Sequence, residues 1–292
     1  MLSIARVLHP TDFSETAEHA LNVALDVAVQ AGAELSIIHS DEEFEDDVVA
    51  SDYIGSSLSE VTASRLSELV DSGILKVHYD LVRSTNPATS ILSYADGKSF
   101  DLTVLGTRGH GRLWTLLLGS VAETVLRQSE SDVLVVHGGE DVPGQTTRHI
   151  VVPVDFSERS ANVLSRARAI AESFSATLHL LFVAEEHVVP IFTDTGIPSL
   201  TWLQLDPEIR EKAEAGLKQL YSNSVGPDVP VTFNVKEGSP AQEIVDFTSE
   251  MHAGFVCMAI RGHSNDSSGL LGSVTERVVR TSPCPVWGLR QE

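Results

Sequence analysis

The chain has 292 residues, 42% of them hydrophobic, which is enough for about two domains with buried cores. Its 41 acidic and 20 basic residues give a formal net charge of −21, and such a surface repels nucleic acid and anionic membranes. No apolar run approaches the roughly 18 residues that cross a bilayer, and the N-terminus lacks a basic flank before an apolar core. We therefore expect a cytoplasmic protein with no nucleic-acid or membrane partner.

The first half of the chain predicts strands that alternate with helices. An apolar, β-branched run at 4–9 predicts a buried strand, and Ser14 is a candidate N-cap for the amphipathic helix that follows. The later predicted elements are a strand at 35–39, a helix at 58–71, a strand at 75–82, a helix opened by Pro87, a strand at 101–105, a helix opened by Gly119 and a strand at 133–136. This alternation implies an α/β fold whose parallel sheet is covered by helices on both faces.

The second half repeats the first. Val152–Glu158 matches His9–Glu15, and Asp155 lies 143 positions after Asp12. Beyond Pro87 the matching residues lie 153 positions apart, so ten residues were gained between the second and third strands. The predicted elements here are strands at 149–154, 178–183, 229–236, 255–258 and 286–289, a helix at 207–222, and helices opened by Ser157, Pro240 and Gly272. We predict a duplicated unit, with domains at 1–139 and 147–292 and a linker at 140–146.

A spaced glycine pattern follows the fourth predicted strand in both halves. It consists of Gly106, Gly109, Gly119 and Ser120 in the first half and of Ala259, Gly262, Gly272 and Ser273 in the second, with nine residues between the last two glycines each time. A glycine at a strand end lets a ligand approach the backbone, and the free N–H groups at a helix start attract an anion. Neither GxxxxGK[ST] nor GxGxxG occurs. The pattern predicts a phosphate site without a lysine; the alternative is that the glycines only permit tight turns.

Two motifs together point to a known family. Pro10-Thr11-Asp12 after the first strand and the glycine pattern after the fourth resemble the ATP-binding type of the universal stress protein family, here as a tandem two-domain member. The resemblance implies two Rossmann-like (adenine nucleotide alpha hydrolase-like) domains, each with a five-stranded parallel sheet of order 3-2-1-4-5. Strands one and four then border the crevice in which open α/β sheets bind ligands.

The same resemblance implies roles for individual residues. Asp12 would contact the ribose or adenine, Pro10 and Thr11 would line the base pocket, and Ile38 or His39 would pack near adenine. The ribose and phosphates would be wrapped by Gly106, Arg108, Gly109, Gly119, Ser120 and Val121. The implied ligand is ATP or AMP, with Mg²⁺ as a companion ion.

The second half departs from the pattern at two positions. Ala259 replaces the first glycine and Val154 replaces Thr11. A methyl group where the backbone should approach the ligand is expected to narrow the site, and valine lacks the threonine hydroxyl. We therefore expect nucleotide mainly in the first domain. The matching residues of the second site are Asp155, Ala259, Arg261, Gly262, Gly272, Ser273 and Val274.

The predicted fifth strands indicate how the two halves of the chain pair. In the family, such strands meet across a two-fold axis, and here 133–136 and 285–289 are both apolar. An exposed apolar strand edge promotes aggregation. We therefore predict that the two halves pair within one chain. The sequence does not decide whether such chains also form a homodimer.

Other side chains give weaker signals. The acidic run at 41–47 is expected to be a solvated loop, the alternative being a carboxylate cluster that recruits a divalent ion. The histidines include no close pair such as HExxH, so no metal site is predicted. Cys257 and Cys284 lie in apolar surroundings and are expected to be buried, inert thiols.

Three functions compete at this point. The first is adenine-nucleotide binding in a stress response, with regulatory rather than metabolic output. The second is a nucleotide-free pairing or interaction module. The third is weak ATP hydrolysis, for which the sequence offers no Walker lysine, metal-binding acid pair or poised nucleophile, so no catalytic residue is assigned.

Overall fold

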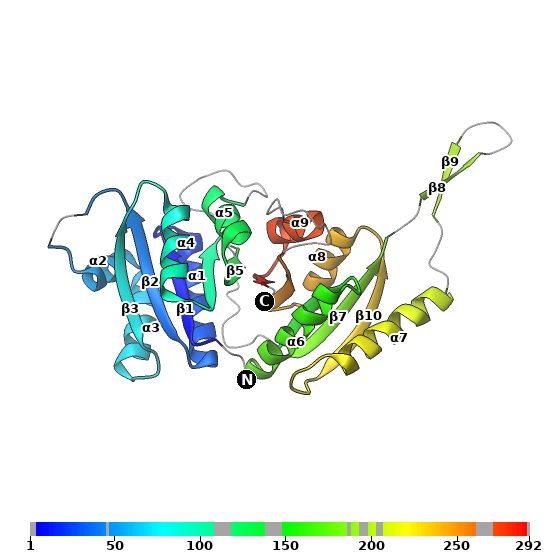
Figure 1. The fold of residues 1–292 in the computed structure, drawn as a ribbon, viewed down its shortest axis with the longest axis horizontal. Coiled ribbons are helices and arrows are strands. Elements are labelled where there is room, and N and C mark those ends of the chain that lie inside the picture. The colour runs from blue at the N-terminus through cyan, green and yellow to red at the C-terminus, as the bar shows by residue number, and fades with distance from the viewer. Residues whose placement is uncertain are drawn as a thin grey trace.

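One continuous sheet runs through both halves of the chain (Figure 1). The computed structural model describes residues 4–44, 47–107, 118–137, 148–185, 188–192, 198–202, 207–260 and 271–290. Ten strands lie in the order β10-β7-β6-β11-β12-β5-β4-β1-β2-β3. Each half contributes five parallel strands, and in each half the order along the sheet is 3-2-1-4-5. This is the strand order that the family resemblance implies.

The first half follows the predicted alternation of strands and helices. Its elements are β1 (Arg6–Thr11), α1 (Glu15–Ala31), β2 (Glu34–Asp41), α2 (Ala50–Ser57), α3 (Glu60–Asp71), β3 (Val77–Arg83), α4 (Pro87–Lys98), β4 (Leu102–Gly106), α5 (Ser120–Gln128) and β5 (Asp132–Val136). The short helix α2 was not predicted from the sequence. It buries a single residue, Ile54, so its sequence carries little amphipathic signal.

The second half repeats these elements with one insertion. It consists of β6 (His149–Val154), α6 (Glu158–Ser173), β7 (Thr177–Ala184), β8 (Val188–Phe192), β9 (Pro198–Trp202), α7 (Pro207–Asn223), β10 (Val231–Glu237), α8 (Pro240–Glu250), β11 (Phe255–Ala259), α9 (Ser273–Thr281) and β12 (Val286–Leu289). Where the first half has α2, an antiparallel hairpin of β8 and β9 projects from the domain (Figure 1). This hairpin lies in the stretch where the second half gained residues.

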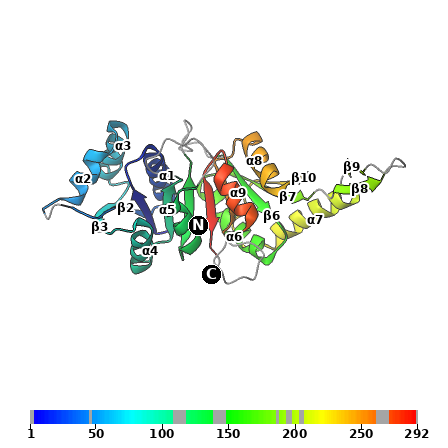
Figure 2. The ribbon, with the colours of Figure 1, turned by 90° about the horizontal axis from the view of Figure 1, so that it is seen from above.

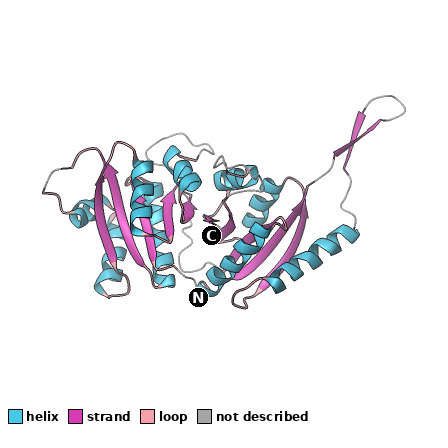
Figure 3. Ribbon diagram, viewed as in Figure 1, coloured by secondary structure: helices cyan, strands magenta, loops and turns pink. Residues whose placement is uncertain are grey.

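Helices cover both faces of the sheet, and each face has its own core (Figures 2 and 3). One core receives buried residues from α1, α2, α3, α6 and α7, and the other from α4, α5, α8 and α9. Among the described residues, no helix combines the length and the hydropathy needed to cross a bilayer. The sequence of α1 shows why these helices form: Ser14 accepts a hydrogen bond from the Ala17 N–H at its start, and Gly32 ends it with φ +65°.

The two halves join through their fifth strands. β5 and β12 pair antiparallel, with Leu134 opposite Trp287. Trp287 is fully buried and meets the Phe255 ring edge-on at 5.6 Å. Pairing of the halves within one chain, predicted from the apolar fifth strands, is therefore confirmed.

A buried ion pair makes this junction asymmetric. Asp132 of β5 accepts a hydrogen bond from Arg166 Nη1 of α6 at 2.8 Å and another from the Arg290 N–H at 2.9 Å. Burial raises the pKa of Asp132, while the Arg166 guanidinium opposes that rise. By the repeat offsets, the counterparts of Asp132 and Arg166 are Pro285 and Val23, so the ion pair occurs once rather than twice. The junction therefore joins two unlike halves.

Both cysteines lie in the cores, as predicted. Cys257 and Cys284 are buried free thiols. Burial raises the pKa of Cys284 to about 12 and raises that of Cys257 as well. Because the thiolate is the reactive form, the raised pKa values disfavour reaction of either thiol in the folded protein.

Candidate functional site

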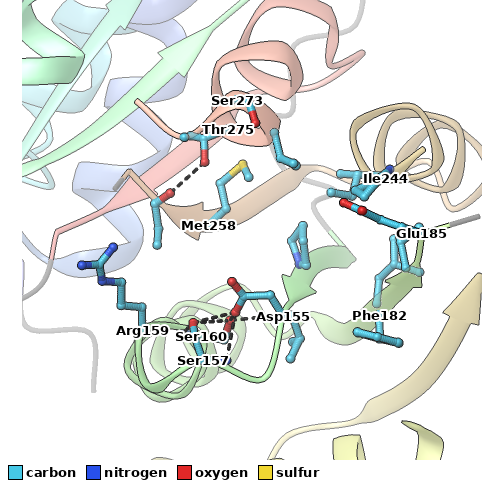
Figure 4. A pocket seen from close by; sticks show the side chains of 18 residues that line it. Asp155, Ser157, Arg159, Ser160, Phe182, Glu185, Ile244, Met258, Ser273 and Thr275 are labelled. Atoms are coloured by element: carbon cyan, nitrogen blue, oxygen red, sulfur yellow. Dashed lines mark hydrogen bonds between the residues drawn. The ribbon is translucent and has the colours of Figure 1, made fainter. Parts of the chain in front are cut away.

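A cavity of about 410 Å³ opens in the second half at the carboxyl ends of β6, β7 and β11, next to the start of α9 (Figure 4). Its volume is in the range of small-molecule sites. Its polar lining includes Asp155, Arg159, Glu185, Ser273 and Thr275. Its apolar lining includes Leu181, Phe182, Ile244 and Met258. The cavity therefore combines apolar walls with a few convergent polar groups.

Asp155 is held at the cavity wall by the start of α6. Its Oδ1 atom accepts hydrogen bonds from the Ser157 N–H at 3.0 Å, from Ser157 Oγ at 2.6 Å and from Ser160 Oγ. Phe156, between them, has the left-handed φ of +56° that this tight turn requires. The same network that caps α6 thus sets the position of the carboxylate.

The first half contains the same aspartate turn. Asp12 Oδ1 accepts from the Ser14 N–H at 3.0 Å and from Ser14 Oγ at 2.6 Å, and Phe13 has φ +59°. Thr11 is buried, and its Oγ1 accepts from the Phe13 N–H at 3.0 Å. The motif that begins at Pro10 therefore builds a rigid turn that presents an exposed aspartate in each half.

The helix that follows the fourth strand starts alike in both halves. Gly272 is the N-cap of α9 and Gly119 is the N-cap of α5, and no described side chain caps either helix. Ser273 and Ser120 are the exposed first residues of these helices. Uncapped N–H groups and the positive end of the helix dipole favour an anion at these positions. In the second half, this helix start lines the cavity.

Gly106 has a packing role. A Cβ atom on Gly106 would lie 2.8 Å from the Thr16 carbonyl oxygen and 3.1 Å from the Ala17 nitrogen. The first turn of α1 therefore packs directly on the end of β4. This contact by itself requires glycine, whereas sequence reasoning attributed the glycine to the approach of a ligand.

We expect Gly106→Ala to destabilise the protein by about 1–3 kcal/mol, because the obstructing atoms belong to backbone that cannot rotate away. The measurement is the urea midpoint of unfolding. Gly97→Ala is the control: nothing lies within 4 Å of a Cβ at Gly97 in α4, so this variant should be unchanged or slightly more stable. Equal midpoints for the two variants would refute the packing role.

Ala259 occupies the position of Gly106 in the second half. It lines the cavity, and its carbonyl oxygen accepts a hydrogen bond from Thr275 Oγ1 at 3.1 Å. The sequence-based expectation was that its methyl group narrows the second site. In the structure, Ala259 lines a cavity whose volume is about 410 Å³.

Several residues of the predicted first site have defined surroundings. Ile38 is fully buried in the core, and its counterpart Leu181, also fully buried, lines the cavity of the second half. Val121 is partly buried against the same core, and its counterpart Val274 lines the cavity. The Gly119 N–H donates to the Thr107 carbonyl at 2.7 Å and thereby joins the start of α5 to the end of β4. Arg108, Gly109, Arg261 and Gly262 lie outside the described residues.

Two histidines stand beside the first aspartate turn. His9 Nδ1 donates to the Val104 carbonyl at 2.9 Å, and burial lowers the pKa of His9 to about 4. His9 is therefore neutral at physiological pH and supplies no charge to an anion site. His39 Nδ1 donates to the Thr11 carbonyl at 2.8 Å. Among the described residues, no group of three or more His, Cys, Asp or Glu side chains is arranged to hold a metal ion.

An aromatic cluster beside the first turn was not predicted. The His39 ring lies 4.5 Å from Phe13 and stacks on Tyr53 of α2 at 5.8 Å. Phe44 meets the His39 and Tyr53 rings edge-on. Phe44 belongs to the acidic run expected to be a solvated loop, so this part of the run also contributes an aromatic contact. Its signal in the sequence was a phenylalanine among the six acidic residues of the run at 41–47.

Comparison with known proteins decides the family. The model of the universal stress protein family matches this chain twice, at residues 3–137 and 146–290. The chain belongs to the universal stress protein family. The two matches correspond to the two halves of the ten-stranded sheet, so this universal stress protein is a tandem member.

Individual relatives agree with this assignment. The protein is 29% identical over 212 residues to a universal stress protein of Mycobacterium tuberculosis, covering 72% of this chain and 67% of that one. It is 29% identical over 153 residues to one of Methanocaldococcus jannaschii, covering 52% of this chain and 85% of the other. The crystal structure of a universal stress protein from Archaeoglobus fulgidus superposes with a TM-score of 0.64 at 22% identity, covering 98% of both chains, which shows a shared fold.

Proposed function

We propose that this universal stress protein binds an adenine nucleotide and that occupancy regulates a partner interaction rather than driving metabolism. The observation that carries the proposal is the cavity of the second half, in which a rigidly held carboxylate, Asp155, faces the same space as the uncapped start of α9. A nucleotide needs both, because its ribose hydroxyls donate hydrogen bonds and its phosphates accept them.

The remaining lining fits the base of such a ligand. Leu181, Phe182 and Ile244 form an apolar wall suited to a flat aromatic ring. Asp155 would then accept from the ribose, and the phosphates would approach Ser273 and the first N–H groups of α9. Mg²⁺ would accompany a triphosphate as its counter-ion rather than occupy a protein site of its own.

The first half supports a second nucleotide site by its matching geometry. Asp12 is held by the same turn as Asp155, and Gly119 and Ser120 open α5 as Gly272 and Ser273 open α9. We propose that Pro10, Thr11 and Val121 line this first site, together with Arg108 and Gly109. Nucleotide would thus bind in both halves, in contrast to the sequence-based expectation of binding mainly in the first.

A pairing module without nucleotide is the second candidate. It is favoured by the junction itself, where β5 and β12 form one sheet and Asp132 is buried against Arg166. Such a junction would fix the geometry of the two halves whether or not a ligand is bound.

Calorimetric titration with ATP, AMP and adenosine separates the two candidates. We expect Asp155→Asn to weaken adenosine binding at one site about tenfold or more, since hydrogen bonds to a charged acceptor are lost. Asparagine keeps an Oδ1 acceptor for the Ser157 N–H, so the cap of α6 should persist. Asp12→Asn is the matched change in the first half. Absence of any adenine-compound affinity in the unsubstituted protein would leave the pairing module as the function.

A further inference from the structure

Arg159 distinguishes the cavity of the second half from the proposed nucleotide site of the first half. It lies in the first turn of α6 and lines the cavity, and its counterpart in α1, by the offset of 143 residues, is Thr16. It is the one basic side chain among the described residues that line the cavity. Asp155 and Glu185 also line it, so a polyanionic ligand needs a local cation there to offset two carboxylates.

Ala259, which replaces Gly106, lines the same cavity as Arg159. In the first half, the glycine lets the backbone at Thr16 come within 2.8 Å of where a Cβ would be. Ala259 carries that Cβ, so a first turn of α6 placed as close to β11 as α1 is to β4 would clash with it. The cavity extends along this turn, and Arg159 and Ser160 line it. The alanine and the arginine therefore both distinguish this cavity from the matching position of the first half.

The positions of the charged groups suggest an orientation for the ligand. In Figure 4, Arg159 and Glu185 lie at opposite ends of the cavity and Asp155 lies between them. A nucleotide with its ribose at Asp155 and its base toward Phe182 and Glu185 would place its phosphates between Arg159 and the start of α9. A guanidinium group suits this task because its N–H fork binds two phosphate oxygens at once.

We infer that Arg159 is the residue by which the second half selects nucleoside di- and triphosphates over the monophosphate and the nucleoside. The inference rests on the proposed nucleotide-binding function and adds a specificity to it. The first half has Thr16 at this position and lacks this cation, so the two halves differ in their preference for phosphate number. One chain thereby responds to two different nucleotide levels.

The test is calorimetric titration of Asp12→Asn protein, in which the first site is weakened, with adenosine, AMP, ADP and ATP. Adding Arg159→Thr should weaken ATP binding about tenfold or more, weaken AMP binding less, and leave adenosine binding unchanged. Arg159→Lys, which keeps the charge but not the fork, should fall between. Because threonine is the residue of the first half, the variant should fold, and an unchanged thermal midpoint would verify that.

Lys212→Thr is the control for net charge, since Lys212 is exposed on α7 and does not line the cavity. It should leave every affinity unchanged. An unaltered ratio of ATP to adenosine affinity in Arg159→Thr, in protein that still binds both, would overturn the role of Arg159 alone. Failure of the Asp12→Asn and unsubstituted proteins to bind even adenosine would overturn the nucleotide proposal and this inference together.

Discussion

Replacing Arg166 by alanine should destabilise the protein by about 3–5 kcal/mol, the usual cost of removing one partner of a buried ion pair. The Asp132 side chain is 2% exposed, whereas that of Arg166 is 40% exposed. Without Arg166, a carboxylate remains buried without its cation. Without Asp132, the arginine can still reach water. Arg166→Ala should therefore cost more than Asp132→Ala, and urea denaturation of both variants measures the difference.

Two further measurements test whether burial of Asp132 causes this loss of stability. Lys76→Ala removes one partner of an exposed ion pair with Glu34 and should leave the urea midpoint nearly unchanged, because solvent screens such a pair. The double variant Arg166→Ala with Asp132→Ala should be less destabilised than the sum of the single variants, because the two groups interact. A greater loss in Asp132→Ala than in Arg166→Ala would contradict the burial argument.

Lowering the pH should reduce the loss of stability that Arg166→Ala causes. Burial already raises the pKa of Asp132, and Arg166 opposes that rise, so removing Arg166 raises the pKa further. A carboxyl whose pKa is higher in the folded state takes up a proton more readily there, so folding gains stability as the pH falls through that pKa. The deficit of Arg166→Ala relative to the unsubstituted protein should therefore be largest at neutral pH and shrink on acidification. A deficit that stays constant with pH would exclude Asp132 as its source.

Local patterns in the sequence were reliable guides to the fold. Ser14 and Ser157 cap α1 and α6, and Gly119 and Gly272 are the N-caps of α5 and α9, because capping depends on a few neighbouring residues. The pairing of β5 with β12 followed from apolar runs that must not remain exposed. Each of these predictions rests on physics that acts within one element or one strand edge.

Contacts between distant residues could not be predicted in this way. Gly106 is required by its contact with the backbone of Thr16, 90 residues earlier in the chain. Neither segment contains a sequence pattern that predicts this contact. The counterparts of Asp132 and Arg166 in the repeat are Pro285 and Val23, so aligning the halves could not reveal the ion pair. The cavity brings together residues of α6, β7, α8 and β11, which lie far apart in the sequence. In the aligned halves Thr16 corresponds to Arg159, and this difference marks the added cation at the second cavity.

Gly288 should be a second point of weakness at the junction of the two halves. It lies in β12 opposite Val133, and a Cβ on it would come within 2.5 Å of Ile260 Cγ1, 2.9 Å of Ile260 Cδ1 and 3.3 Å of Leu126 Cδ1. Since Leu126 belongs to the first half and Ile260 to the second, an added methyl group presses on the side chains of both. We expect Gly288→Ala to cost about 1–3 kcal/mol, and Gly288→Val to cost more.

A second substitution identifies the cause of that loss. Ile260→Ala removes the two nearest atoms, so combining it with Gly288→Ala should destabilise the protein by less than the sum of the separate changes. Gly55→Ala in α2, where nothing lies within 4 Å of a Cβ, controls for the change from glycine to alanine itself. Denaturant midpoints of the four variants provide the comparison. Strict additivity of Gly288→Ala and Ile260→Ala would mean that the two side chains do not compete for space, and that glycine at the junction serves another purpose.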